Sequence, residues 1–91
     1  MPCGAPPPPP VFPLVHVKKV TSGKCDGELA PIMTAHECQL AAQHLGIDDN
    51  VELWETQWRP QGCWSSSGSL YLSPDGAQEC SEWYECICYY P

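Results

Sequence analysis

Seven of the 91 residues are cysteines, and this density constrains the fold more than any other feature of the sequence. A chain this short buries too little apolar surface to be stable through core packing alone, so covalent or partner stabilisation is expected. A cytosolic protein of this size rarely carries so many cysteines unless they are spaced as metal ligands. We therefore predict one disulfide-stabilised domain in an oxidising compartment.

The spacing of the cysteines and histidines argues against a metal centre. Cys86 and Cys88 form the one close pair, whereas structural zinc sites usually bring Cys-x2-Cys pairs. His36 and His44 would lie about 12 Å apart along a helix, too far to share one ion. The acidic stretch at residues 48–52 lacks the glycine and the distal glutamate of an EF-hand loop. We predict no metal site and no cofactor.

Catalytic motifs are also missing from the sequence. A redox role would require Cys-x-x-Cys at a helix N-terminus, which does not occur here. The serines at positions 65–69 stand in a predicted loop and lack the G-x-S-x-G pattern of a hydrolase nucleophile. We predict a protein that is not an enzyme.

Disulfides remain as the role of the cysteines, although the sequence alone cannot choose among the fifteen pairings that six cysteines allow. One preference joins Cys63 to Cys80, joins Cys38 to either Cys86 or Cys88, and leaves the other for Cys25. Cys3 is then either free or bonded to another chain, unless the pairing differs. The candidate intramolecular cysteines are Cys25, Cys38, Cys63, Cys80, Cys86 and Cys88.

The clearest secondary-structure signal is a helix over about residues 34–45. Thr34 and Glu37 form a capping box, and Gly46 ends the helix. Strands are predicted at residues 14–21, at LYL and in ECICYY, and a strand or an irregular extended stretch at 51–58. SSSGS and SPDG are predicted to be a loop and a turn. The fold class is thus a small disulfide-rich α+β domain, with one helix packed on a small antiparallel sheet.

A proline-rich arm precedes this domain. Residues 5–13 read APPPPPVFP, and prolines cannot donate the hydrogen bonds of a helix or a sheet. We predict a stiff polyproline II conformation for residues 5–13, within an extended arm over residues 1–13, and a folded domain over residues 14–91. The arm either folds back on the domain or is held by a partner.

The charge and hydropathy of the chain limit its partners and its location. The formal net charge is -7, which disfavours nucleic acid and anionic membrane surfaces. No apolar run reaches the roughly 18 residues that span a bilayer, so we expect no transmembrane segment. The start of the chain does not have the pattern of a signal peptide. We expect a mature form or a fragment from which a targeting segment has been removed.

Aromatic residues are numerous, with four tryptophans and four tyrosines. Trp64, beside Cys63, is expected in the core, but the rest cannot all be buried, and exposed aromatics often anchor interfaces. Aromatic planes also stack on sugars, although the sequence shows no convergent polar set to orient one. The candidates for binding a partner are Pro6, Pro7, Pro8, Pro9, Pro10, Phe12, Trp54, Trp58, Tyr89 and Tyr90.

The stretches ECQLAAQHLG, QGCW, SGSLYLSPDG and ECICYY together resemble a small cysteine-rich domain, often repeated, in predicted proteins of dinoflagellates and other algae. The resemblance covers roughly residues 25–90, and the arm and Cys3 lie outside it. The matching positions are Cys38, Ala41, Ala42, Leu45, Gly46, Pro60, Gly62, Cys63, Trp64, Leu70, Tyr71, Cys80, Cys86 and Cys88.

The resemblance implies a disulfide-stabilised module of a secretory or lumenal setting, with no catalytic residues to carry over. An acidic module with such an arm would suit an accessory subunit docked on a larger, membrane-embedded protein complex. One such place is the lumenal side of an algal photosystem, in the thylakoid lumen. The alternative is an extracellular recognition module that binds glycan or protein ligands.

Overall fold

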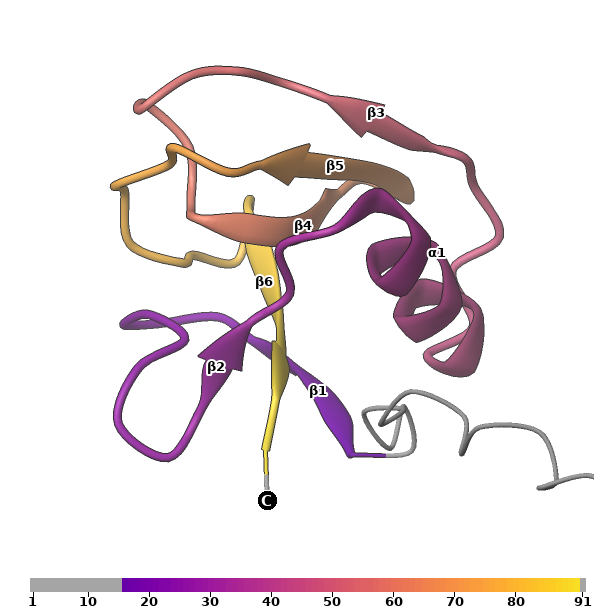
Figure 1. The fold of residues 1–91 in the computed structure, drawn as a ribbon, viewed down its shortest axis with the longest axis horizontal. Coiled ribbons are helices and arrows are strands. Elements are labelled where there is room, and N and C mark those ends of the chain that lie inside the picture. Colours follow the sequence, from indigo (N-terminus) through magenta and orange to yellow (C-terminus); the bar gives the residue numbers. More distant parts are fainter. Residues whose placement is uncertain (1–15, 91) are drawn as a thin grey trace, which may run out of the picture.

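The computed structural model describes residues 16–90, so the predicted arm and Cys3 lie outside the described residues. One helix and six strands follow each other along this part of the chain (Figure 1). Their bounds are β1 Val17–Val20, β2 Ala30–Pro31, α1 Ala35–His44, β3 Val51–Leu53, β4 Gly62–Ser66, β5 Ser69–Ser73 and β6 Glu85–Tyr89. The described part of the chain is therefore one helix with a sheet, as predicted.

The sheet is mixed, so the expectation of an antiparallel sheet is only roughly right. The strand order is β1-β6-β4-β5-β3, and β2 also pairs with β6. β3 runs parallel to β5, because the chain reverses its direction between β3 and β4 and again between β4 and β5. Both edges of β6 are used: β1 covers one, and β4 and β2 share the other. The last strand is thus the element that joins the two halves of the sheet.

The serine-rich stretch predicted as a loop is instead a tight hairpin between β4 and β5. Ser67 and Gly68 have φ of 51° and 83°, the left-handed values that a type I′ turn requires at both central positions. The twist of this turn matches the twist of the flanking strands, so pairing extends up to Ser66 and Ser69. The prediction missed β4 because serine is a poor marker of strands.

The helix begins and ends where the sequence predicts. Thr34 is the N-cap, and its hydroxyl oxygen accepts a hydrogen bond of 3.3 Å from the backbone N–H of Glu37. Gly46 follows the cap residue with a φ of 80°. Cys38, Ala41 and Ala42 are fully buried, so the predicted face of small residues packs against the sheet. Small side chains allow the close approach of the helix backbone to the strands.

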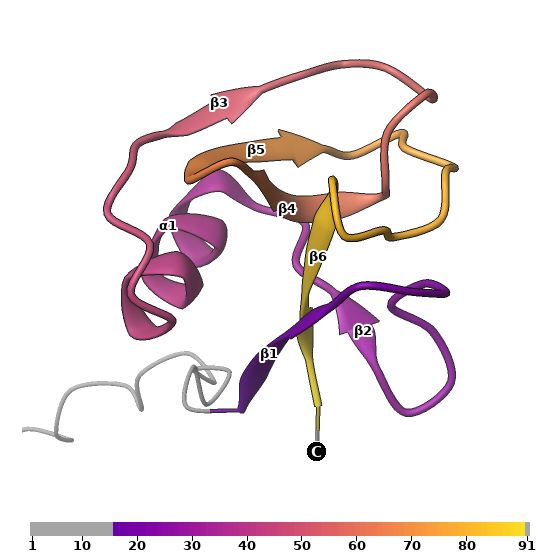
Figure 2. The same ribbon diagram turned by 180° about the vertical axis from the view of Figure 1, so that it is seen from behind.

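The two faces of the sheet differ in what covers them (Figures 1 and 2). We call the face under α1 the helix-side face, and its core includes Cys63, Leu70 and Ile87. Paired residues share a face, and alternate residues along a strand point to opposite faces. Trp64 pairs with Tyr71 and with Cys86, so all three point to the other side, which we call the open face.

Three disulfides join the described cysteines, and they indicate an oxidising, non-cytosolic environment. Cys25 bonds to Cys88, one of the pairings that the sequence analysis preferred. As predicted, Cys86 and Cys88 do not bond to each other. The bonds are Cys25–Cys88, Cys38–Cys63 and Cys80–Cys86.

The other two preferred pairings are wrong, and the alternation of β4 and β6 gives the reason. Cys63 points to the helix-side face, where it meets Cys38 of α1. Cys86 points to the open face, where the loop that carries Cys80 folds back onto it. A bridge from Cys63 to Cys80 would have to cross the sheet.

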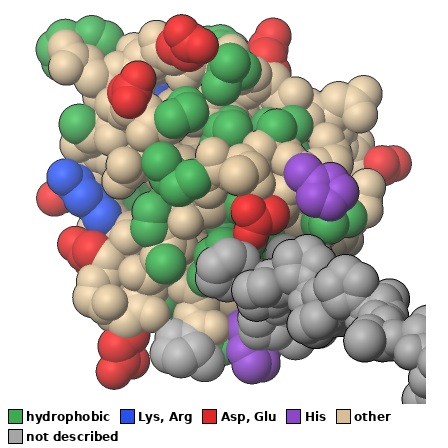
Figure 3. All heavy atoms as spheres, in the orientation of Figure 1, with side chains coloured by type: hydrophobic (Ala, Val, Ile, Leu, Met, Phe, Trp, Pro, Cys, Tyr) green, Lys and Arg blue, Asp and Glu red, His purple; other side chains and the backbone are tan. Residues whose placement is uncertain are grey.

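The surface carries many more acidic than basic side chains, as the formal charge of -7 requires (Figure 3). Residues 16–90 contain no helix that could cross a membrane.

Candidate functional site

The open face carries a cluster of aromatic rings around Trp64, which is itself 1% exposed. The Trp64 ring stacks on Tyr71 with 4.4 Å between ring centroids, and Trp54 and Tyr84 meet it edge-on at 6.0 and 5.4 Å. The indole N–H of Trp64 donates a 3.0 Å hydrogen bond to the hydroxyl of buried Ser73. We call Trp54, Trp64, Tyr71 and Tyr84 the aromatic cluster.

Arg59 covers the aromatic cluster with its guanidinium group. The central guanidinium carbon lies 4.6 Å from the ring centroid of Tyr84 and 5.5 Å from that of Trp54. One terminal nitrogen donates a 2.8 Å hydrogen bond to the carbonyl of Trp58, whereas the buried Nε has no partner within the described residues. The positive charge is therefore held by the rings rather than by a carboxylate.

Two further tryptophans beside this cluster project into solvent. Trp58 is 69% exposed and Trp83 is 71% exposed, compared with 37% for Trp54. A large aromatic side chain in water gains no burial energy for its own fold. Such side chains are the ones that most often anchor protein interfaces.

Trp58 stands on a backbone that is fixed from both sides. Its own N–H bonds to the Thr56 hydroxyl at 3.1 Å. The segment that contains Ala77 holds it from the other side, since the Ala77 N–H donates a 3.1 Å hydrogen bond to the Gln57 carbonyl. Gly76 permits this approach, because a Cβ there would collide with the carbonyl oxygens of residues 59 and 60.

Trp83 stands at the tip of a short loop closed by the Cys80–Cys86 disulfide, which we call the Trp83 loop (residues 80–86). Within it, Ser81 N–H bonds to the Tyr84 carbonyl at 2.9 Å, and Tyr84 N–H bonds to the Ser81 hydroxyl at 3.1 Å. These bonds make a tight turn with Glu82 and Trp83 at its centre. The loop is therefore rigid and presents Trp83 outward.

The structure separates the residues that the sequence singled out for partner binding. Trp54 and Trp58 lie on and beside the aromatic cluster, whereas Tyr90 stacks on His16 at 5.6 Å near the start of β1. Tyr89 packs partly buried against the helix-side core. The candidates of the arm lie outside the described residues: Pro6, Pro7, Pro8, Pro9, Pro10 and Phe12.

Trp83 was missed as a candidate for the site. The available signal was its place between two cysteines six positions apart, Cys80 and Cys86, flanked by glutamates. Without the pairing of these cysteines, the segment looks like any connection to the last strand. The disulfide turns it into a closed loop with an exposed tip.

Tyr89 and Glu37 join β6 to the helix through a hydrogen bond from the phenol to the carboxylate. Hydrogen bonds from Tyr89 and from the Thr34 hydroxyl hold the pKa of Glu37 below its ordinary value. Burial, together with the hydrogen bond to Glu37, raises the pKa of Tyr89. Tyr89 is thus engaged in holding the helix on the sheet.

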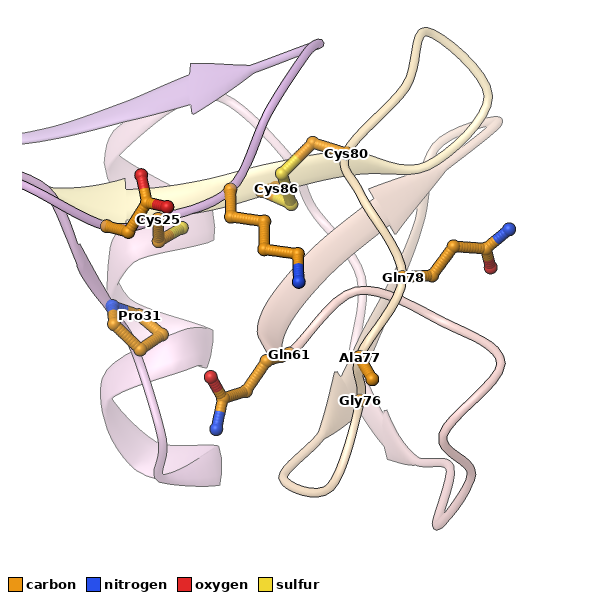
Figure 4. Close-up of a pocket in the computed structure, with 10 residues that line it drawn as sticks. Cys25, Pro31, Gln61, Gly76, Ala77, Gln78, Cys80 and Cys86 are labelled. Carbon is orange, nitrogen blue, oxygen red and sulfur yellow. A yellow bond between two sulfur atoms is a disulfide. The ribbon is translucent and has the colours of Figure 1, made fainter.

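A small cavity of about 100 Å³ lies between the two disulfides of the open face (Figure 4). Cys25, Cys80 and Cys86 line one part of it, and Pro31 and Gln61 line another. The cavity is large enough for a few water molecules but too small for an organic ligand of ordinary size. It belongs to the packing around the disulfides.

A second hollow is an open groove of about 340 Å³ beside the exposed ring of Trp58. Gln57, Ala77 and Gln78 complete its lining. Figure 4 shows the side chain of Gln78 pointing away from the disulfide cavity. The groove therefore combines one aromatic plane with two amide side chains, which the sequence analysis did not find.

Metal-ligating groups do not gather anywhere in residues 16–90. The acidic stretch at residues 48–52 serves the fold instead. A carboxylate oxygen of Asp49 accepts a 3.0 Å hydrogen bond from the backbone N–H of Leu70, at the start of β5. The Gln39 amide binds the backbone on either side, at Asp49 and Val51.

We take the aromatic cluster, Trp58 and Trp83 together as the candidate site and call them the aromatic surface, because exposed aromatic side chains of this kind often anchor binding partners. Comparisons of the chain with models of known protein families, with curated proteins and with solved structures give no match.

Proposed function

We propose that the protein is a non-catalytic subunit that docks on a larger protein assembly through the aromatic surface. The observation that carries this proposal is the exposure of Trp58 and Trp83, at 69% and 71%, on backbone that is fixed by hydrogen bonds and a disulfide. A rigid anchor loses little conformational entropy when it binds, so a larger part of its burial energy contributes to affinity.

In its finer form, the proposal places the assembly in a membrane, on the lumenal side of an algal photosystem. Support for this form comes from the resemblance to algal cysteine-rich domains and from the acidic charge. The three disulfides support an oxidising compartment, which the thylakoid lumen and the extracellular space would both provide. The proline-rich arm would give the subunit a second point of attachment.

The test is co-migration with the assembly after mild, non-reducing extraction and density-gradient separation. We expect the unaltered protein to migrate with a complex much larger than itself. The double variant Trp58→Ala, Trp83→Ala should bind at least about tenfold more weakly and remain near the top of the gradient. Leu53→Ala is the matched control, because Leu53 is 56% exposed and pairs with Leu72 on the other face of the sheet. Equal loss with the control would contradict the proposal.

A second candidate function is recognition of a glycan, and the groove beside Trp58 favours it. An aromatic plane can stack on a sugar ring while the amides of Gln57 and Gln78 bond its hydroxyl groups. A glycan array would decide this. Selective binding that Trp58→Ala abolishes and Trp83→Ala preserves would favour the glycan function over protein docking.

A further inference from the structure

The Trp83 loop carries negative charge around its exposed tip. Glu82 precedes Trp83 in the turn, and Glu79 stands just before the loop; both side chains are exposed. Among residues 16–90 the structure contains one ion pair, in which the Lys19 ammonium lies 4.0 Å from a carboxylate oxygen of Glu85. The charges of Glu79 and Glu82 are therefore not neutralised within the described part of the protein.

None of the lysines of residues 16–90 forms an ion pair with Glu79 or Glu82. Lys18 and Lys19 belong to β1, where Lys18 lies 5.6 Å from the ring centroid of Tyr90. Lys24 lines the cavity between the disulfides, as do Cys80 and Cys86 of the Trp83 loop, but it forms no ion pair within the described residues. Arg59 is held over the aromatic cluster. No cation of residues 16–90 is recorded within ion-pair distance of the two glutamates beside Trp83.

Arg59 shows that rings of this surface accept a cation. Its guanidinium lies 4.6 Å from the centroid of Tyr84, which is the neighbour of Trp83 in the same loop. Tryptophan is the best of the aromatic side chains at attracting a cation, and an exposed one can receive it from outside. A nearby carboxylate strengthens such a contact through its own attraction for the same charge.

These observations lead from a general docking surface to one kind of partner. We infer that the Trp83 loop binds a segment of a partner protein in which an arginine or lysine stands beside apolar residues. The cation lies over the Trp83 ring and pairs with Glu82 or Glu79, and the apolar neighbours cover the edge of the indole. This inference rests on the proposed docking function and specifies the chemistry of the partner.

The disulfide has a definite part in this binding. Cys80 and Cys86 close the loop, and Cys80 N–H also bonds to the Gly23 carbonyl at 2.7 Å. Tyr84 anchors the other side of the turn against Trp64 at 5.4 Å. Trp83 and Glu82 are therefore held in place before binding, which reduces the entropy lost when the partner docks.

The probe is a pair of synthetic peptides of equal length and equal leucine content, one with arginines and the other with glutamates at the same positions. Binding is followed by calorimetry and by the shift of the Trp83 indole N–H signal in NMR spectra. We expect the arginine peptide to bind and the glutamate peptide not to bind. The affinity should fall steeply as ionic strength rises, because the charges are exposed to solvent.

Three variants locate the binding on the loop. Trp83→Ala and Glu82→Lys should each weaken binding of the arginine peptide by about tenfold. Glu28→Lys, which changes the net charge equally at an exposed position of another loop, should leave it within about twofold. No binding of the arginine peptide overturns the inference. Equal weakening by Glu28→Lys also overturns it, since the attraction would then come from net charge alone.

The same variants separate this inference from the docking proposal. If Trp83→Ala releases the protein from its assembly while Glu82→Lys does not, docking through the aromatic surface stands and the cationic partner is wrong. If the arginine peptide binds at the loop while neither these substitutions nor the double variant Trp58→Ala, Trp83→Ala releases the protein, the docking proposal fails and the loop chemistry stands.

Discussion

The two faces of the sheet are stabilised in different ways. The helix-side face is covered by α1, and its core includes the fully buried Ile32, Ala41, Leu70 and Ile87. No helix of residues 16–90 covers the open face. Two of the three disulfides lie there, with the aromatic cluster beside them.

This difference teaches how a small domain can keep one face free for binding. A second layer of secondary structure normally covers the apolar side of a sheet. Here the Cys25–Cys88 and Cys80–Cys86 bonds tie the loops to β6 and take over part of that role. A disulfide covers little of the protein surface, so side chains such as Trp58 and Trp83 can remain exposed.

Removing the Cys25–Cys88 bond should have the largest effect, because this bond spans 63 positions of the sequence. Loop-closure entropy assigns it about 4 kcal/mol of the free energy of unfolding. That is a large fraction of the total for a small domain. We expect Cys25→Ala, Cys88→Ala to unfold at a much lower denaturant concentration, as measured by circular dichroism.

The helix-side disulfide provides the comparison for this prediction. Cys38–Cys63 spans 25 positions, which corresponds to about 3.5 kcal/mol, and α1 still packs on the sheet without it. The Cys38→Ala, Cys63→Ala variant should therefore be the more stable of the two. The reverse order would show that the open face depends less on its covalent bonds than the comparison of the faces suggests.

Removing the Cys80–Cys86 bond should lower the free energy of unfolding less than removing either of the other two bonds, but it should weaken association with the assembly more. The bond spans six positions, so its loss lowers the free energy of unfolding by about 2 kcal/mol. The turn that carries Trp83 would then be free to change shape, and we expect weaker association with the assembly even where the domain stays folded. Gradient migration at a temperature well below unfolding measures this effect. Unchanged association would contradict the view that the loop must be preformed.

The sequence was sufficient for elements whose signals are local. The cap at Thr34, the small-residue face of α1 and the alternation in β6 all depend on neighbouring residues, and the structure contains them. The pairing of Cys63 was not predictable in this way. It depends on which face of β4 the residue points to, and no strand was predicted there, since the last two residues of β4 lay in a predicted loop.

The candidate site was predictable only in part for the same reason. Trp54 and Trp58 stand in one aromatic-rich stretch and could be selected from sequence. Trp83 was missed because the Cys80–Cys86 bond that closes its loop was not among the preferred pairings. The groove between Trp58 and Gln78 arises from contacts between segments about twenty positions apart, made through backbone bonds from residues 77 and 78. Such non-local contacts have no periodic signature in a single sequence.

Substitution of Arg59 tests whether the cation held over the aromatic cluster stabilises the open face. Replacing it with methionine keeps most of the side-chain volume but removes the cation from Trp54 and Tyr84. We expect the free energy of unfolding to fall by about 1 kcal/mol, measured by denaturant titration. Arg59→Lys, which keeps the charge, should lose less. Because methionine also removes the unpaired Nε, a methionine variant as stable as the unaltered protein would mean that the cation contributes no more than burial of this nitrogen costs.

The smallest effect is expected on the helix-side face, from the contact between Glu37 and Tyr89. Because the fold lowers the pKa of Glu37, the contact stabilises the protein above the ordinary pKa of 4.5, and this stabilisation is lost as the pH falls through the lowered value. Glu37→Gln should therefore reduce the free energy of unfolding by about 0.5 kcal/mol at neutral pH, after allowance for solvent screening. The difference in stability between the two proteins should disappear in acid, as followed by thermal unfolding over a pH series.

Glu28→Gln, at an exposed position in another loop, serves as the control. A constant difference at every pH would mean that the glutamate stabilises the helix-side face through packing and not through its charge.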